Sequence, residues 1–141
     1  MKKLLSLALL AAMLIFSSKA MAQSWGPDFA KFNITPEAGW TASAVDSGVQ
    51  LTNNKSVMIV QVVKSGGLKP EDFAKAVVAK AGITDPKYTS SDEGCKMVGK
   101  KEGQEITMVL VADDDKMAIF TLSGPDSEAM GKMMESLQDA N

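Results

Sequence analysis

The methionines near the C-terminus are the residues whose type and spacing most readily suggest a binding chemistry. Met130, Met133 and Met134 lie at helical spacing, and thioether sulfur is a soft ligand that suits Cu(I). The same spacing also places three flexible apolar side chains on the buried side of a helix, where methionine commonly fills a core. We therefore predict a core-facing helix side, and keep a methionine-rich, copper-handling protein of the periplasm as the alternative function.

Cys95 is the only cysteine, so it cannot form a disulfide within the chain. It is either a small buried hydrophobe on a strand or a thiol that reacts or pairs with another chain. Activation of a thiolate needs positive charge nearby, and the sequence has no histidine or arginine, although Lys96 is adjacent. The buried interpretation is favoured.

The absence of histidine excludes histidine general bases and the usual Ser-His and Cys-His nucleophiles. Gly66-Gly67 precedes a predicted helix but lacks the pattern of a phosphate-binding loop. The acids at 113–115 are consecutive, whereas a calcium loop alternates its ligands and has a glycine bend, so we predict a hairpin turn there. We expect no catalytic residue, no cofactor and, outside the methionine alternative, no metal ligand.

Residues 1–22 have the three parts of a secretory signal peptide. A basic start precedes an apolar run, Leu4–Phe16, which is too short to span a bilayer with ease, and Ala20-Met21-Ala22 matches the small–x–small cleavage pattern. We expect export through the Sec pathway and cleavage between Ala22 and Gln23. The mature chain, 23–141, would be periplasmic or secreted, without stable membrane insertion; a membrane anchor or core helix is the alternative.

The charge of the mature chain excludes two classes of partner. The removed segment contains three lysines and no acid, so cleavage changes the net charge from −2 to −5. Nucleic-acid binding needs a cationic face and usually arginine, and this chain has no arginine. An acidic surface also disfavours binding to anionic lipid. We therefore expect neither nucleic acid nor a membrane surface as the partner.

A buried strand followed by a helix forms the expected centre of the fold. Ser56–Lys64 is apolar on both faces, which is typical of an interior strand covered on both sides. Pro70 suits the first turn of a helix, acids follow it, and Gly82 is a natural stop, so we predict a helix over 70–81.

Alternation of apolar and polar residues predicts the other elements. Residues 83–94 are expected to be mostly loop, and a final helix is expected after Ser123, which forms a capping-box-like pair with Asp126. The remaining predicted strands are 29–34, 40–45, 49–52, 95–98, 104–112 and 116–122. This order predicts a single α+β domain, with an antiparallel sheet of about six to seven strands and two main helices packed on it.

Several local patterns resemble the PsbP-like and DcrB-like family of small exported α+β proteins. They are Phe32-Asn33-Ile34-Thr35-Pro36 followed by Gly39-Trp40, the turn and strand at Val49–Asn53, the helix opening at Gly67–Phe73, and Glu135-Ser136-Leu137 in the closing helix. The resemblance covers most of 23–141 and implies an antiparallel sheet between helices, generally without a catalytic site. It implies a non-enzymatic binding or accessory role in assembly at the cell envelope, with an envelope protein as partner, and it transfers no functional residue.

Overall fold

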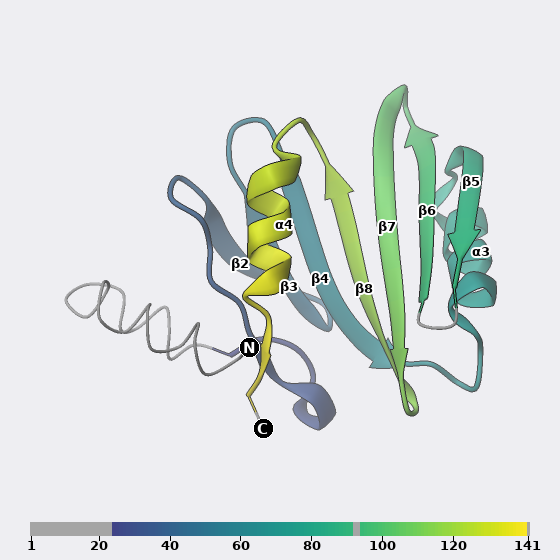
Figure 1. Cartoon of the computed structure of the whole chain (residues 1–141), viewed down its shortest axis with the longest axis horizontal. Helices are drawn as coiled ribbons and strands as arrows, with labels where there is room; N and C mark the ends of the chain where they lie inside the picture. The colour runs from purple at the N-terminus through teal and green to yellow at the C-terminus, as the bar shows by residue number, and fades with distance from the viewer. Residues whose placement is uncertain (1–23, 92–93, 141) are drawn as a thin grey trace.

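The computed structural model describes residues 24–91 and 94–140 (Figure 1). The predicted signal peptide and its cleavage site at Ala22 and Gln23 lie outside these residues. In chain order the described elements are η1 (Asp28–Ala30), β1 (Phe32–Asn33), β2 (Thr41–Val45), β3 (Gly48–Thr52), β4 (Val57–Lys64), α3 (Pro70–Ala81), β5 (Thr84–Ser90), β6 (Gly94–Lys101), β7 (Gln104–Asp113), β8 (Lys116–Ser123), α4 (Ser127–Glu135) and β9 (Gln138–Asp139).

The fold is a seven-stranded sheet with two α-helices packed on it, which confirms the predicted α+β class. The strand order is β2-β3-β4-β8-β7-β6-β5, and all neighbouring strands are antiparallel. β1 and β9 form a separate two-stranded pair that brings the two ends of the described chain together. Within the described ranges, neither helix has both the length and the apolar composition that a membrane crossing requires.

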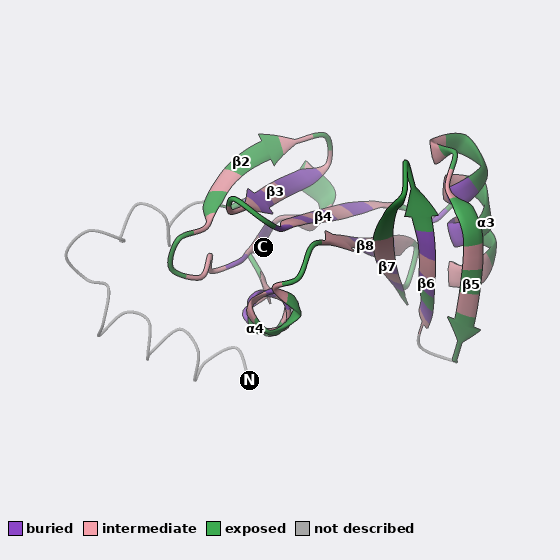
Figure 2. Cartoon of the chain, turned by 90° about the horizontal axis from the view of Figure 1, so that it is seen from above, coloured by how far each residue is buried: buried purple, intermediate pink, exposed green. Residues whose placement is uncertain are grey.

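The two helices cover opposite faces of the sheet, and they do so over opposite halves. In Figure 1, α4 lies in front of the half that contains β2, β3 and β4, and α3 lies behind β5 and β6. Figure 2, seen from above, shows α3 beyond β5 at one end of the sheet and α4 below β3 and β4. We call the two sides of the sheet the α4 side and the α3 side.

Each helix has its own hydrophobic core. The buried residues of the α4-side core are Trp25, Phe32, Ile34, Val49, Leu51, Met58, Val60, Val62, Phe120, Met130 and Met133. Those of the α3-side core are Ala74, Val78, Cys95, Met97, Met108, Leu110, Met117 and Ile119. β8 contributes to both cores because its successive side chains point to opposite faces.

β4 is an interior strand as predicted, but only one of its faces is fully covered. Val60 on the α4 side is 0 % exposed, and Met58 and Val62 beside it are also buried. Ile59 and Val63 point to the α3 side and are only half-buried, because α3 lies over the other half of the sheet. The expected cover on both faces of this strand is therefore wrong for Ile59.

The helix after β4 matches its prediction at both ends. α3 runs from Pro70 to Ala81 with two acids in its first turn. Gly82 has φ 74°, the left-handed conformation of a helix C-cap, and its N–H donates to the carbonyl of Val78. Local chemistry alone is sufficient to place such a helix.

Three expectations about local structure are wrong. The first strand is shorter than 29–34, because Asp28–Ala30 is a 3-10 turn in which the Ala30 N–H bonds to the carbonyl of Pro27. Residues 84–90, expected as loop, form the edge strand β5, whose irregular pairing between Thr84 and Lys87 accommodates Pro86. α4 begins at Ser127, and Ser123 belongs to β8.

Candidate functional site

The α4 side of strands β5 to β8 forms an uncovered apolar face. Within the described ranges, α4 is the only α-helix on this side, and in Figure 1 it lies over the other half of the sheet. The register places side chains from four strands on this face, and we call this set the open face. Its members are Lys87 and Thr89 on β5, Lys96, Val98 and Lys100 on β6, Glu105, Thr107, Val109, Val111 and Asp113 on β7, and Lys116, Ala118, Phe120 and Leu122 on β8.

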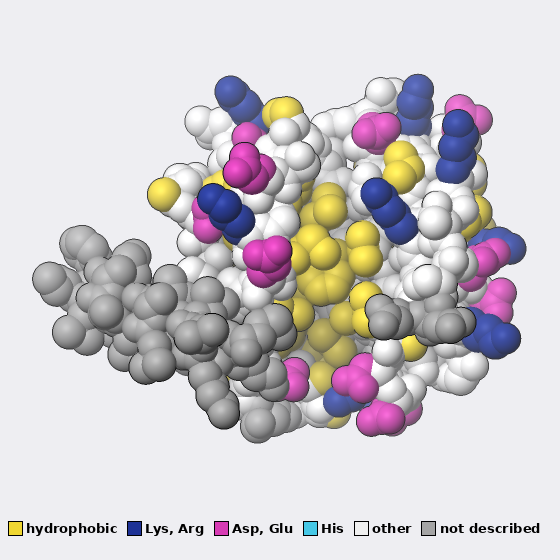
Figure 3. All heavy atoms as spheres, viewed as in Figure 1, with side chains coloured by type: hydrophobic (Ala, Val, Ile, Leu, Met, Phe, Trp, Pro, Cys, Tyr) yellow, Lys and Arg dark blue, Asp and Glu magenta, His cyan; other side chains and the backbone are white. Residues whose placement is uncertain are grey.

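The apolar centre of the open face is on β7. Val111 is 38 % exposed and Val109 is half-buried, although both lie on an interior strand of the sheet. Figure 3 shows apolar side chains gathered in a hollow between α4 and the strands to its right, with lysine side chains beyond it. An uncovered apolar surface in the middle of a sheet is typical of a binding site.

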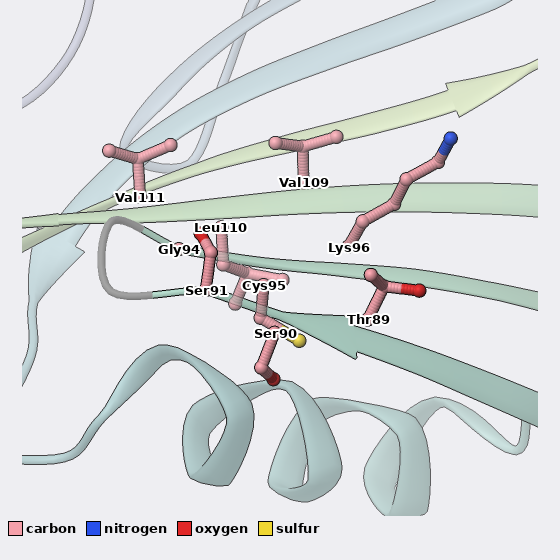
Figure 4. Close-up of a pocket in the computed structure, with 9 residues that line it drawn as sticks. All are labelled: Thr89, Ser90, Ser91, Gly94, Cys95, Lys96, Val109, Leu110 and Val111. Atoms are coloured by element: carbon pink, nitrogen blue, oxygen red, sulfur yellow. The ribbon is translucent and has the colours of Figure 1, made fainter.

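Three hollows indent this part of the molecule. A hollow of about 320 Å³ includes Thr89, Lys96, Val109 and Val111 in its lining, and Figure 4 shows these four side chains on one side of the sheet. The side chains of Cys95 and Ser90 point the other way in Figure 4, toward the helix.

The other two hollows lie at the opposite ends of the same strands. One of about 350 Å³ is lined by Thr107 and Leu122 from the sheet and by Ser127 and Met130 from α4, so it lies where α4 meets β7 and β8. The second, of about 480 Å³, includes Lys87, Val98, Lys100 and Glu105. The three hollows together extend along the open face, and each is open to solvent, unlike a closed small-molecule cavity.

Positive charge lines the outer part of the open face. Lys87 and Lys96 are exposed, and among the described residues neither belongs to an ion pair. Lys100 lies on the same side further along β6, directly opposite Glu105. These lysines belong to a chain whose mature form is expected to be acidic, so their position around an apolar centre favours an anionic partner.

The most organised polar cluster is at the start of α4. The Ser56 hydroxyl donates to Asp126 Oδ2 at 2.7 Å, and Asn53 Nδ2 donates to the same oxygen at 3.1 Å. The Asp126 N–H donates back to Ser56 Oγ at 3.1 Å. The hydrogen bonds from Ser56 and then from Asn53 lower the pKa of Asp126, because they stabilise the carboxylate.

This cluster fastens α4 to the turn between β3 and β4. The capping box expected between Ser123 and Asp126 is wrong: Asp126 is at the N-cap position, but its carboxylate faces Ser56 and caps no N–H of the helix. Ser56 is buried, and its oxygen is occupied by the bonds to Asp126. Among the described residues, the only base that this hydroxyl meets is the Asp126 carboxylate, whose lowered pKa makes it a weak base, so we assign the cluster a structural role.

The three methionines are placed as a core-facing helix side predicts. Met130 is 3 % exposed and Met133 is 0 % exposed, both in the α4-side core, and Met134 is half-buried against it. Within the described residues, no group of three or more His, Cys, Asp or Glu side chains could hold a metal ion. Copper binding through the methionines stays a prediction, and it would require the sulfurs of Met130 and Met133 to be reached in the core.

Cys95 is 3 % exposed on the α3 side of β6, where it packs in the core beneath α3. The interpretation as a small buried hydrophobe is confirmed. The open-face residues were not predicted as a site. The signal in the sequence is that Thr107, Val109 and Val111 give β7 a second apolar face, but alternation does not tell which face lacks a cover.

Neither a protein-family model nor a curated protein matches this chain. Among solved structures, the chain is similar to the solution structure of cyanobacterial PsbP (CyanoP) from Synechocystis sp. PCC 6803, with a TM-score of 0.48 and 11% identity, over 83% of this chain and 91% of that chain. The likeness concerns the path of the chain and carries no residue or activity to this protein.

Proposed function

We propose that this chain is a non-enzymatic accessory protein of the cell envelope, which works by binding another protein on its open face. The observation that carries the proposal is the exposure of Val111, with Val109 beside it, on an interior strand. Sheets in two- and three-layer folds normally bury both apolar faces. A partner that covers these valines would complete the layer that α4 leaves unfinished.

The chemistry of the described residues supports binding over catalysis. The hydroxyl of Ser56 is held by Asp126, and Cys95 is buried, so neither is available as a nucleophile. The chain has no histidine to act as a general base. The copper-handling alternative has no structural observation in its favour, because two of its three methionines are in the core.

Location in the envelope rests on residues 1–22. Their charged start, apolar run and cleavage pattern support export and removal after Ala22. Intact-mass measurement of the periplasmic protein should show a chain that begins at Gln23, with or without cyclisation to pyroglutamate. Protein that retains Met1 in the membrane fraction would contradict the proposed cleavage.

Site-specific crosslinking in cells tests the binding face. A photoreactive residue at Val111 should give a discrete adduct with one envelope protein, identified by mass spectrometry. The matched control carries the same residue at Lys80, which is exposed on α3. Adducts of equal yield from both positions, or none from Val111, would show that the open face is not the binding surface.

A further inference from the structure

The geometry points to a specific class of occupant for the open face, an inference that rests on the proposed function. We propose that the partner contributes an acidic amphipathic helix that lies along β7, beside α4. Its apolar side chains would cover Val109 and Val111, and its carboxylates would face Lys87 and Lys96. Length, layer geometry and charge each favour this occupant.

The length of the apolar strip suits a short helix. Thr107, Val109 and Val111 alternate with α3-side residues along β7, so they lie on one side at intervals of two residues. A strand rises about 3.4 Å per residue, so the three side chains span about 14 Å. A helix rises about 5.4 Å per turn, so two to three turns cover the strip.

Layer geometry favours a helix over an added strand. β7 already pairs with β6 on one side and β8 on the other, so its backbone groups are engaged and cannot accept a further strand. A helix needs only side-chain contacts. α3 packs in this way on the opposite face of the same strands, where its Ala74 and Val78 are buried.

Charge selects the kind of helix. Lys87 and Lys96 are exposed on the open face, and among the described residues neither forms an ion pair. Thr89 pairs with Lys96 in register, and Lys87 pairs with Val98, so both lysines lie at the β5–β6 margin of the apolar strip. An amphipathic helix with acids on that flank would place carboxylates against both lysines.

Other occupants fit less well. A second copy of this chain would have to offer one of its own helices, and the outer residues of α4 are polar: Glu128, Lys132 and Glu135 are exposed. An anionic amphiphile such as a fatty acid resembles the proposed helix, because it also combines a negative charge with an apolar surface. Small-molecule sites bury most of their ligand, however, whereas these hollows lie open along the face.

The test uses isotope-labelled protein purified from the periplasm and four probes followed by NMR. They are a synthetic helical peptide with a leucine stripe flanked by glutamates, the same peptide with lysines for glutamates, a scrambled acidic peptide without the stripe, and dodecanoate. We expect the acidic amphipathic peptide to shift the amides of Val98, Val109 and Val111. It should bind at least about tenfold more tightly than the other three.

Charge-reversal variants show whether the acidic helix binds the lysines of the open face or is attracted by the overall charge of the protein. In Lys87→Glu combined with Lys96→Glu, the affinity for the acidic helix should fall about tenfold and that for the basic helix should rise. Lys69→Glu combined with Lys80→Glu, two exposed lysines at the two ends of α3, makes the same change in net charge away from the open face and should leave both affinities unchanged.

The inference is overturned if the acidic helix causes no localised shift, if the basic or scrambled peptide binds equally well, or if dodecanoate is preferred. It is also overturned if the double reversal on α3 has the same effect as the double reversal on the open face. In each of these cases, a discrete adduct from Val111 in cells would keep the proposed function and reject only the acidic helix. Loss of that adduct would reject the binding face itself.

Discussion

Ser56 and Asp126 are 70 positions apart in the sequence and are joined by a 2.7 Å hydrogen bond from hydroxyl to carboxylate. Ser56 lies immediately before β4, and Asp126 lies immediately before α4, so the bond fastens the helix to the edge of the turn that leads into the sheet. Gly124 lies against the same serine, and a Cβ at this glycine would collide with the Ser56 hydroxyl. Because α4 borders the open face, this contact also determines where that face ends.

Removal of the Ser56 hydroxyl should loosen the attachment of α4. Ser56→Ala leaves the Asp126 carboxylate without its shortest hydrogen bond, and we expect a loss on the order of 1 kcal/mol in the free energy of unfolding. Thermal melts followed by circular dichroism measure the loss. Ser43→Ala on β2, where the serine is exposed, is the control and should melt as wild type. Equal melts for both variants would show that the contact adds no stability.

The same contact predicts that the stability of the fold depends on pH. The pKa of Asp126 is lowered from 3.8 by its hydrogen bonds to Ser56 and Asn53. A lowered pKa in the folded state stabilises the fold above the ordinary value, and this contribution disappears as pH falls through the lowered pKa. The difference in melting temperature between wild type and Asp126→Asn should therefore shrink below pH 3.8.

The difference between wild type and Asp126→Asn reports the contribution of the Asp126 carboxylate alone. Glu71 and Asp115 also have lowered pKa values, mainly through hydrogen bonds to Ser90 and Lys64 respectively. Both are present in wild type and variant, so their contributions to the pH dependence cancel in the difference. A difference that stays constant from neutral pH to well below 3.8 would contradict the role of Asp126.

The two faces of β4 should respond differently to a charge. Val60→Asp places a carboxylate without a partner in the α4-side core, which costs several kcal/mol against a total stability of about 5–15 kcal/mol, so the domain should unfold. Ile59→Asp affects a half-buried position and should leave the domain folded, with a loss of about 1–2 kcal/mol. Thermal melts of the two variants measure both effects. Unfolding of Ile59→Asp would show that the α3 side of β4 is covered at this position.

The copper alternative can be tested by substitution of the three methionines of α4. Met130→Leu, Met133→Leu and Met134→Leu preserve volume, so each should cost less than about 1.5 kcal/mol. Because the first two sulfurs are buried, we expect wild type not to take Cu(I) from a competing chelator in a titration. Stoichiometric Cu(I) binding that disappears in the triple variant would establish the metal site and contradict the purely structural role.

Residues close together in the sequence determined much of this fold. Pro70 and Gly82 define the two ends of α3, because proline suits a first helical turn and glycine adopts the left-handed C-cap. The hairpin of β7 and β8 follows from alternation on both sides of an acidic turn. The helical spacing of Met130 and Met133 likewise predicts their burial. In each case the physical cause acts within a few residues.

Contacts between distant residues decided the rest. Alternation shows that Val109 and Val111 share a face, but the position of α4 decides that this face stays open. The Asp126 carboxylate accepts a hydrogen bond from Ser56 instead of capping α4, because the fold brings together two residues that are far apart in the chain. β5 was not predicted as a strand because Asp85 and Pro86 disfavour one, and it is a strand because β6 offers it a partner along an otherwise unpaired edge. Pairing, cover and long-range hydrogen bonds are properties of the assembled sheet, and local sequence patterns do not encode them.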